Sequence, residues 1–97
     1  MTFILKFEEE ALAEWKKLDK SVSEPLKKKL AKRLQNPRVE NERLTGQLKD
    51  CYKIKNNKTG HRLVYRVIDA EVVVLVLAVG KREDLAAYLA AASRLKS

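Results

Sequence analysis

Every second position from Phe3 to Phe7 is a large apolar residue. This period of two is typical of a strand with one buried face, so we predict a strand over residues 2–7. The spacing then changes to the helical period, which predicts a helix over residues 8–20. Its apolar stripe is formed by Leu12, Trp15 and Leu18.

A second helix is predicted to begin at Ser21, because Ser21 and Glu24 have the spacing of a capping box. Pro25 then falls in the first turn, where its missing N–H costs little, and Pro37 ends the helix. The buried side is expected to be Leu26, Leu30 and Leu34.

Three strand-like runs follow a polar connection over residues 38–50. The runs cover residues 51–55, 62–68 and 72–79. The short segments between them are rich in turn-forming residues, which predicts two hairpins. A closing helix is predicted over residues 84–96. Its apolar side is Leu85, Tyr88, Leu89, Ala92 and Leu95.

The resulting order, β-α-α-β-β-β-α, predicts an α+β fold with an antiparallel four-stranded sheet and helices packed on it. The length of 97 residues allows one core, so residues 1–97 are interpreted as a single domain. The longest apolar run, residues 72–79, is too short to cross a membrane, which takes about 20 residues. No signal peptide is recognised, and we expect a cytoplasmic protein without a membrane partner.

Charge and rare residues narrow the function classes. The formal net charge is +8, which favours a polyanionic partner such as nucleic acid, an acidic protein or anionic lipid. The single cysteine, Cys51, excludes an internal disulfide, and one cysteine with one histidine, His61, cannot supply a zinc-binding set. No metal or other cofactor is expected, and Cys51 is expected to be buried rather than reactive.

Strand register concentrates part of the positive charge. If Ile54 pairs with Leu63 so that both face the core, Lys55 lies directly opposite Arg62. Lys53, Lys55, Arg62 and Arg66 then share the outer face. Solvated strand faces are usually charged, but they carry mixed signs, whereas this face carries one sign at a cost to sheet stability.

A second basic block lies on the polar side of the second predicted helix. It consists of Lys27, Lys28, Lys29, Lys32 and Arg33. A solvated helix face is the simpler interpretation, and the alternative is a surface that follows the phosphates of a structured RNA. Lys81 and Arg82 follow the last strand and are expected to extend the sheet patch.

These residue types suit RNA cleavage, because RNA supplies its own nucleophile, the 2′-OH. Crowded cations such as Lys53, Lys55 and Arg62 lower the pKa of a lysine amine, which favours a neutral amine as the base. Tyr88 is a candidate for stacking on a splayed base, and core packing at helical spacing is an equal alternative. Neither a nucleophile elbow nor a Gly-rich phosphate loop is present.

The segments CYKIK at 51–55, GHRLVY at 60–65 and GKRE at 80–83, followed by Tyr88, resemble the RelE toxins of toxin–antitoxin systems. The resemblance covers nearly the full length. It implies a microbial-ribonuclease-like fold and an mRNA interferase that cuts messenger RNA in the ribosomal A site. It also implies a cognate RelB-like antitoxin, and contact with operator DNA only through the antitoxin complex.

The resemblance also assigns roles to residues. The implied catalytic set is Lys53, Lys55, Arg62, Arg82 and Tyr88. The lysines would supply the base and charge stabilisation, the arginines would hold the phosphate, and Arg82 would also aid the leaving group. The basic helix and Lys81 would contact RNA or the ribosome. Thr45 departs from the pattern, because related sequences often have a basic residue there, and His61 is a weaker candidate for proton transfer than the lysines.

Two other functions stay open at this point. A ParE-like toxin of the same fold poisons DNA gyrase, but it lacks the set formed by Lys53, Lys55, Arg62 and Arg82. A basic RNA- or antitoxin-binding module without strong catalysis is the third interpretation, and Thr45 is its only support in the sequence.

Overall fold

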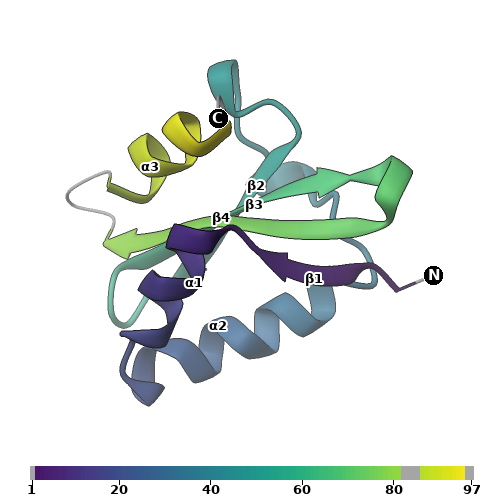
Figure 1. The fold of residues 1–97 in the computed structure, drawn as a ribbon. Helices are drawn as coiled ribbons and strands as arrows, with labels where there is room; N and C mark the ends of the chain where they lie inside the picture. Colours follow the sequence, from purple (N-terminus) through teal and green to yellow (C-terminus); the bar gives the residue numbers. More distant parts are fainter. Residues whose placement is uncertain (1, 82–85, 96–97) are drawn as a thin grey trace.

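The structure is a computed structural model that describes residues 2–81 and 86–95 (Figure 1). Its helices and strands are β1 Ile4–Phe7, α1 Glu9–Lys16, α2 Lys20–Arg33, β2 Cys51–Asn56, β3 His61–Ile68, β4 Val73–Lys81 and α3 Ala86–Leu95. Three short 3-10 helices add to the predicted order. They are η1 Glu40–Glu42, η2 Gly46–Leu48 and η3 Asp69–Glu71. The fold is α+β, as predicted, but its element order departs from the prediction at these insertions.

The four strands form one mixed sheet in the order β1-β4-β3-β2. The β2–β3 and β3–β4 pairs are antiparallel, whereas β1 runs parallel to β4, with Ile4 opposite Val73. The prediction of a purely antiparallel sheet is therefore wrong at β1. Hydrophobic alternation shows which face of a strand is buried, but it carries no information about strand direction.

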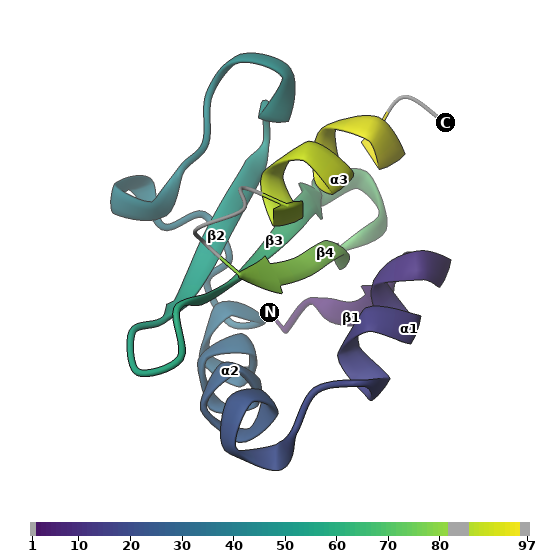
Figure 2. The same ribbon diagram turned by 90° about the vertical axis from the view of Figure 1, so that its left-hand side faces the viewer.

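Helices cover both faces of the sheet. The two helices α1 and α2 lie on one face and α3 lies on the other, as the two perpendicular views show (Figures 1 and 2). Beneath α1 and α2 is the larger core, to which Leu26, Leu30, Tyr52, Ile54, Leu63 and Tyr65 contribute. Beneath α3 is a smaller cluster formed by Leu48, Cys51, Val64, Leu77, Ala78, Ala87 and Ala91. The face predicted to be open is thus partly covered, and Val64 is fully buried.

Helix α2 begins earlier than the capping box predicts. The Asp19 carboxylate accepts hydrogen bonds from the backbone N–H and the hydroxyl of Ser21, so Asp19 is the N-cap and Ser21 lies within the helix. Pro25 is therefore inside the helix rather than in its first turn. Leu26 and Leu30 are buried, as predicted.

The apolar sides of α1 and α3 agree in part with the prediction. In α1, Trp15 packs against the larger core, as Leu18 does just beyond the helix, both as predicted, but Ala11 is buried there and Leu12 is exposed. In α3, Ala87 and Ala91 are buried and Leu89 is 68% exposed, whereas Tyr88, Ala92 and Leu95 pack against the cluster beneath the helix, as predicted. Leu85 lies outside the described residues. Small residues allow α3 to approach the sheet closely, because a Cβ atom on Gly80 would lie 3.2 Å from the backbone nitrogen of Ala87.

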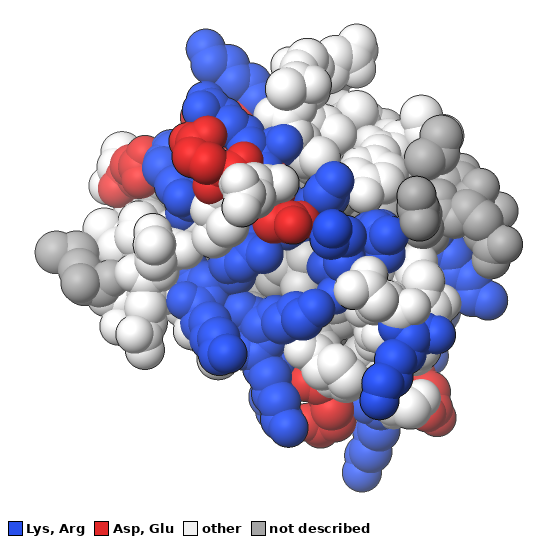
Figure 3. Space-filling view, turned by 180° about the vertical axis from the view of Figure 1, so that it is seen from behind, with Lys and Arg blue, Asp and Glu red and all other residues white. Residues whose placement is uncertain are grey.

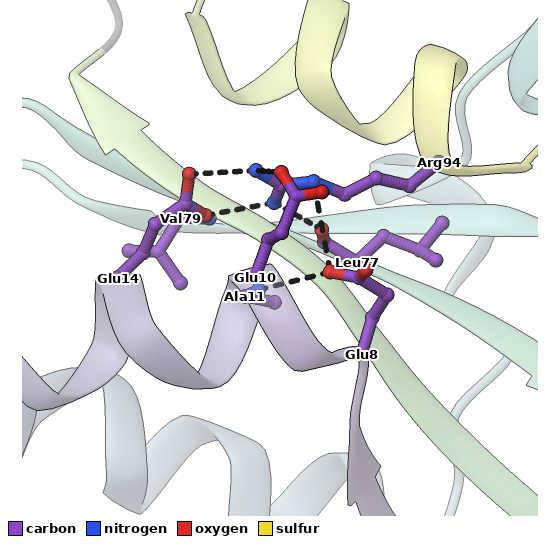
Figure 4. A network of polar contacts seen from close by, with 7 residues as sticks. All are labelled: Glu8, Glu10, Ala11, Glu14, Leu77, Val79 and Arg94. Carbon is purple, nitrogen blue, oxygen red and sulfur yellow. Dashed lines mark hydrogen bonds and ion pairs between the residues drawn. The ribbon is translucent and has the colours of Figure 1, made fainter.

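Arg94 joins α3 to α1 and β4 (Figure 4). Its guanidinium donates to both carboxylate oxygens of Glu14 at 2.9 and 3.0 Å, and to the carbonyl of Leu77 at 2.7 Å. Glu8 and Glu10 lie 3.6 and 3.1 Å from the same guanidinium. No sequence pattern predicts this network, because its members are far apart in the chain.

Candidate functional site

The β2–β3 hairpin has the predicted register. Ile54 lies opposite Leu63, and Lys55 lies opposite Arg62. The turn is closed by Gly60, whose positive φ of 77° favours glycine, and by a hydrogen bond from its N–H to the carbonyl of Asn56. The Asn56 side chain is buried, and its amide donates to the carbonyl of Val22 in α2. These contacts fix the end of the hairpin that carries the predicted catalytic cations.

Arg62 is a buried cation beside a second cation. Only 6% of the residue is exposed, and its guanidinium donates to the carbonyl of His61 at 3.2 Å. Among the described residues, no carboxylate lies within 4.0 Å of it. A buried guanidinium that lacks an acidic partner in this part of the chain is well suited to bind an anion from outside.

The other predicted catalytic residues lie at different depths. Lys53 is half-buried opposite Val64, close to the part of the sheet that α3 covers. Tyr88 on α3 is half-buried and packs against the cluster beneath that helix. Arg66 lies opposite Cys51 at the far end of the hairpin. Arg82 lies outside the described residues.

Two members of the basic helix block contact β2 directly. The Lys29 amine donates to the carbonyl of Lys55 at 2.5 Å. The Arg33 guanidinium donates to the carbonyl of Lys53 at 3.1 Å and to the hydroxyl of Tyr65 at 2.9 Å. Lys29 and Arg33 therefore hold α2 against the edge strand, in addition to carrying charge. The members that remain free for a partner on the exposed side are Lys27, Lys28 and Lys32.

A groove between α2 and β2 brings the two basic groups of residues together. Its volume is about 270 Å³, and it is lined by Lys29, Lys32, Arg33, Glu42, Lys55 and Asn57. Lysine and arginine side chains gather across the middle of one face of the molecule (Figure 3). The helix block and the hairpin cations were predicted to be separate surfaces, whereas in the structure Lys55 of the hairpin lines the same groove as Lys29, Lys32 and Arg33 of α2.

Glu42, at the end of η1, is a site residue that the sequence analysis missed. Its Oε1 lies 3.6 Å from the Lys55 amine, and 18% of its side chain is exposed. Its Oε2 is buried and has no hydrogen-bond partner among the described residues. The segment around Glu42 has no hydrophobic period, so nothing in the sequence placed this carboxylate beside β2.

Lys81 and His61 lie opposite each other at the ends of β4 and β3. Lys81 is exposed. Burial and the charge of Lys81 lower the pKa of His61, while its backbone hydrogen bond to Thr59 acts in the opposite direction. The imidazole is therefore predominantly neutral at pH 7, and its Nδ1 lies 2.9 Å from the Thr59 hydroxyl. By register, His61 faces the side of Asn56 and Leu63 rather than that of Lys55.

Neither a metal site nor a reactive thiol is found in the described part of the chain. No three histidine, cysteine or acidic side chains gather there in a way that would hold a metal ion. Cys51 is buried, as predicted, and burial raises the pKa of its thiol to about 11. No helix within residues 2–81 and 86–95 is long and apolar enough to cross a membrane.

Comparison with known proteins identifies relatives of this chain. Residues 5–86 match the family model described as the ParE toxin of the type II toxin–antitoxin system parDE. The chain is 52% identical over 95 residues to the mRNA interferase toxin RelE of Escherichia coli strain K12, and the match covers 98% of this chain and 99% of the relative.

Solved structures of E. coli RelE also match this chain. A double mutant of E. coli toxin RelE in the free state has a TM-score of 0.90 and 50% identity, over 98% of this chain and 99% of that one. The toxin in the intact E. coli RelBE toxin–antitoxin complex has a TM-score of 0.79 and 54% identity, over 81% of this chain and 95% of that one.

Proposed function

Because the chain belongs to the RelE/ParE family of type II toxins, we propose that it is an mRNA interferase, an endoribonuclease that stops translation by cutting messenger RNA. The observation that carries this proposal is the pair of opposed cations Lys55 and Arg62 on β2 and β3. Two like charges directly opposite each other destabilise a sheet, so their placement is best explained by an anionic substrate.

The reaction proposed is attack of a ribose 2′-OH on the neighbouring phosphate. The 2′-oxygen loses its proton to a base and bonds to phosphorus, and the bond from phosphorus to the 5′-oxygen breaks. The 5′-oxygen takes up a proton, which leaves a 2′,3′-cyclic phosphate and a 5′-hydroxyl. No cofactor is needed, because the substrate supplies the nucleophile and the protein supplies charge and proton transfer.

Residues of the hairpin take the central roles in this reaction. Lys55, with Lys53, supplies the base and stabilises the extra negative charge of the transition state. Arg62 holds the phosphate through a guanidinium that has no acidic partner among the described residues. Arg82 acts as a second clamp near the leaving group, a role that rests on the family resemblance alone. Tyr88 stacks on a base with the part of its ring that is not packed against the sheet.

The ribosome and an antitoxin are the proposed partners. Cutting takes place in the ribosomal A site, and ribosomal RNA is contacted by the exposed lysines of α2 and by Lys81. One solved relative is a complex of E. coli RelE with its antitoxin RelB. We therefore expect a cognate RelB-like antitoxin for this chain, contact with operator DNA only through that complex, and a cytoplasmic location.

A gyrase-poisoning toxin is the second candidate, favoured by the ParE description of the matching family model. It has less support, because the relative matched over almost the whole chain is an mRNA interferase. A DNA supercoiling assay separates the two functions. A gyrase poison accumulates cleaved plasmid DNA, whereas an interferase leaves plasmid topology unchanged.

The direct test compares wild type with Lys55→Met in a translation system, with cleavage read from the 5′ ends of the messenger RNA. We expect Lys55→Met to cut about 100-fold more slowly, the usual scale for loss of one charge-stabilising group. Lys6→Met, which removes an exposed cation on β1, is the control and should cut at the wild-type rate. Equal cleavage by wild type and Lys55→Met would contradict the assignment.

A further inference from the structure

The groove between α2 and β2 contains one carboxylate among four cations. Among the described residues, Glu42 is the only acid within 4.0 Å of the Lys55 amine, and Lys32 has no acid at that distance. The amines of Lys32 and Lys55 and the amide of Asn57 can all donate hydrogen bonds into the groove. This set of donors matches the oxygens of a phosphate group, with Glu42 in competition for one of them.

Glu42 also carries a cost for the fold. A buried oxygen without a hydrogen bond destabilises a protein, and Glu42 Oε2 is such an atom within the described part of the chain. Its partner oxygen contacts Lys55 at 3.6 Å, which is longer than a direct charge-assisted hydrogen bond. The pair is therefore weak enough to be exchanged for a better anion.

We propose that this groove binds a phosphate of the RNA backbone, and that Glu42 is a positioning residue that holds the Lys55 amine until the phosphate replaces it. The inference rests on the proposed function for the identity of the substrate. In the structure Lys55 is paired with Glu42. When RNA enters, the amine exchanges one anion for another and becomes part of the phosphate site that also includes Lys32.

The position of Lys55 explains why this exchange matters for the reaction. Its backbone carbonyl is anchored by Lys29, and its Cα lies opposite Arg62, so only the side chain is free to move. The Glu42 pair keeps that side chain on the groove side of the hairpin. Entry of RNA into the groove would thus be coupled to release of the Lys55 amine from Glu42 onto the bound phosphate.

The test measures binding rather than cleavage. The probe is a hexanucleotide of single-stranded RNA with 2′-O-methyl riboses, which cannot be cut, titrated at low salt and followed by fluorescence anisotropy. We expect Glu42→Gln to bind it about fivefold more tightly than wild type, the scale of one ion pair near the surface. Glu40→Gln is the matched control, because Glu40 lies in the same 3-10 helix and pairs with Arg43 instead.

A second pair of variants tests whether Lys55 carries the effect. In a Lys55→Met background, Glu42→Gln should improve binding by less than twofold, because there is no amine to release. Equal affinities of wild type and Glu42→Gln would overturn the proposal, and so would a fivefold gain that persists without Lys55. Thermal unfolding of each variant identifies any change that comes from loss of the fold.

Failure of the proposed function and failure of the role of Glu42 give different results. A chain that binds the uncut RNA and cleaves no messenger RNA on ribosomes would contradict the proposed function. Cleavage by the wild type with identical RNA affinities of wild type and Glu42→Gln would contradict the role of Glu42 alone.

Discussion

Lys55 and Arg62 are direct cross-strand neighbours, and Arg62 is the more deeply buried of the two. A buried guanidinium beside another cation costs folding free energy, because neither charge neutralises the other. The presence of this pair in the hairpin therefore lowers the free energy of unfolding.

Replacing Arg62 by methionine should consequently stabilise the protein while it removes activity. We expect the free energy of unfolding to rise by about 1 kcal/mol, because an apolar side chain of similar length replaces a buried charge. Cleavage of messenger RNA should fall by about 100-fold. Urea unfolding and a cleavage assay measure the two effects on the same preparation.

Arg66→Met is the matched control, since Arg66 is an exposed cation on the same strand and the same face. Its stability and cleavage rate should stay close to those of wild type. A loss of stability in Arg62→Met would show that Arg62 has a structural role that outweighs its desolvation cost.

The Glu14–Arg94 contact predicts a pH dependence of stability. Burial raises the pKa of Glu14, but hydrogen bonds from Arg94 and from the Val79 N–H outweigh it, and the pKa lies below its ordinary value of 4.5. A lowered pKa in the folded state stabilises the fold above the ordinary value, and this contribution is lost as the pH falls through the folded pKa. Wild type should therefore lose stability below about pH 4.5.

Glu14→Gln tests this assignment by urea unfolding at neutral and acidic pH. The variant should be less stable than wild type at pH 7, and the difference should shrink as the solution is acidified below pH 4. A difference that stays constant with pH would mean that the charge of Glu14 contributes nothing. Glu9→Gln, which changes an exposed acid in the same helix, serves as the control.

Cys51 should not react with thiol reagents in the folded protein. Its thiol is fully buried and has a pKa of about 11, so the nucleophilic thiolate is scarce at pH 8. A disulfide reagent such as DTNB should label it only as fast as the protein opens, and at once in concentrated urea. Rapid labelling of the native protein at pH 8 would contradict the buried position of Cys51.

Pro25→Ala should stabilise helix α2. A proline inside a helix lacks the N–H that would bond to the carbonyl four residues earlier, and it costs up to about 3 kcal/mol. We expect the free energy of unfolding in urea to rise by about 1–2 kcal/mol.

The N-cap of helix α2 is tested by two alanine variants in the same urea assay. Asp19→Ala should lower the free energy of unfolding by about 1 kcal/mol through loss of the cap, whereas Ser21→Ala should lower it by less. The reverse order of these two losses would place the helix start at Ser21, as the sequence pattern predicted.

Much of the hairpin was predictable from the sequence. The pairing of Ile54 with Leu63 followed from the rule that a shift of one residue turns every side chain to the other face. That rule also placed Lys55 opposite Arg62, which is the basis of the candidate site. The buried positions of Leu26, Leu30 and Cys51 followed from spacing and residue type.

The features that were missed depend on contacts between distant segments. Hydrophobic period located α3 and the side on which Tyr88, Ala92 and Leu95 pack. It missed the fully packed small residues Ala87 and Ala91, and it wrongly placed the exposed Leu89 on the buried side. The parallel direction of β1 is set by the path of the chain around the sheet. Glu42 reaches Lys55 only because η1 folds against β2, and a polar connection gives no pattern from which that contact follows.

The parallel pairing of β1 with β4 also determines when the fold can be completed. The first strand is made early in synthesis, but its partner Val73–Lys81 is the last strand of the sheet to be made. Until then β1 has no strand to pair with, and the larger core lacks Val74, Val76 and Val79 of β4. The core of a nascent chain, and with it the groove that this core supports, is therefore completed only after most of the chain has been synthesised, because the β1–β4 pair joins segments that are far apart in the sequence.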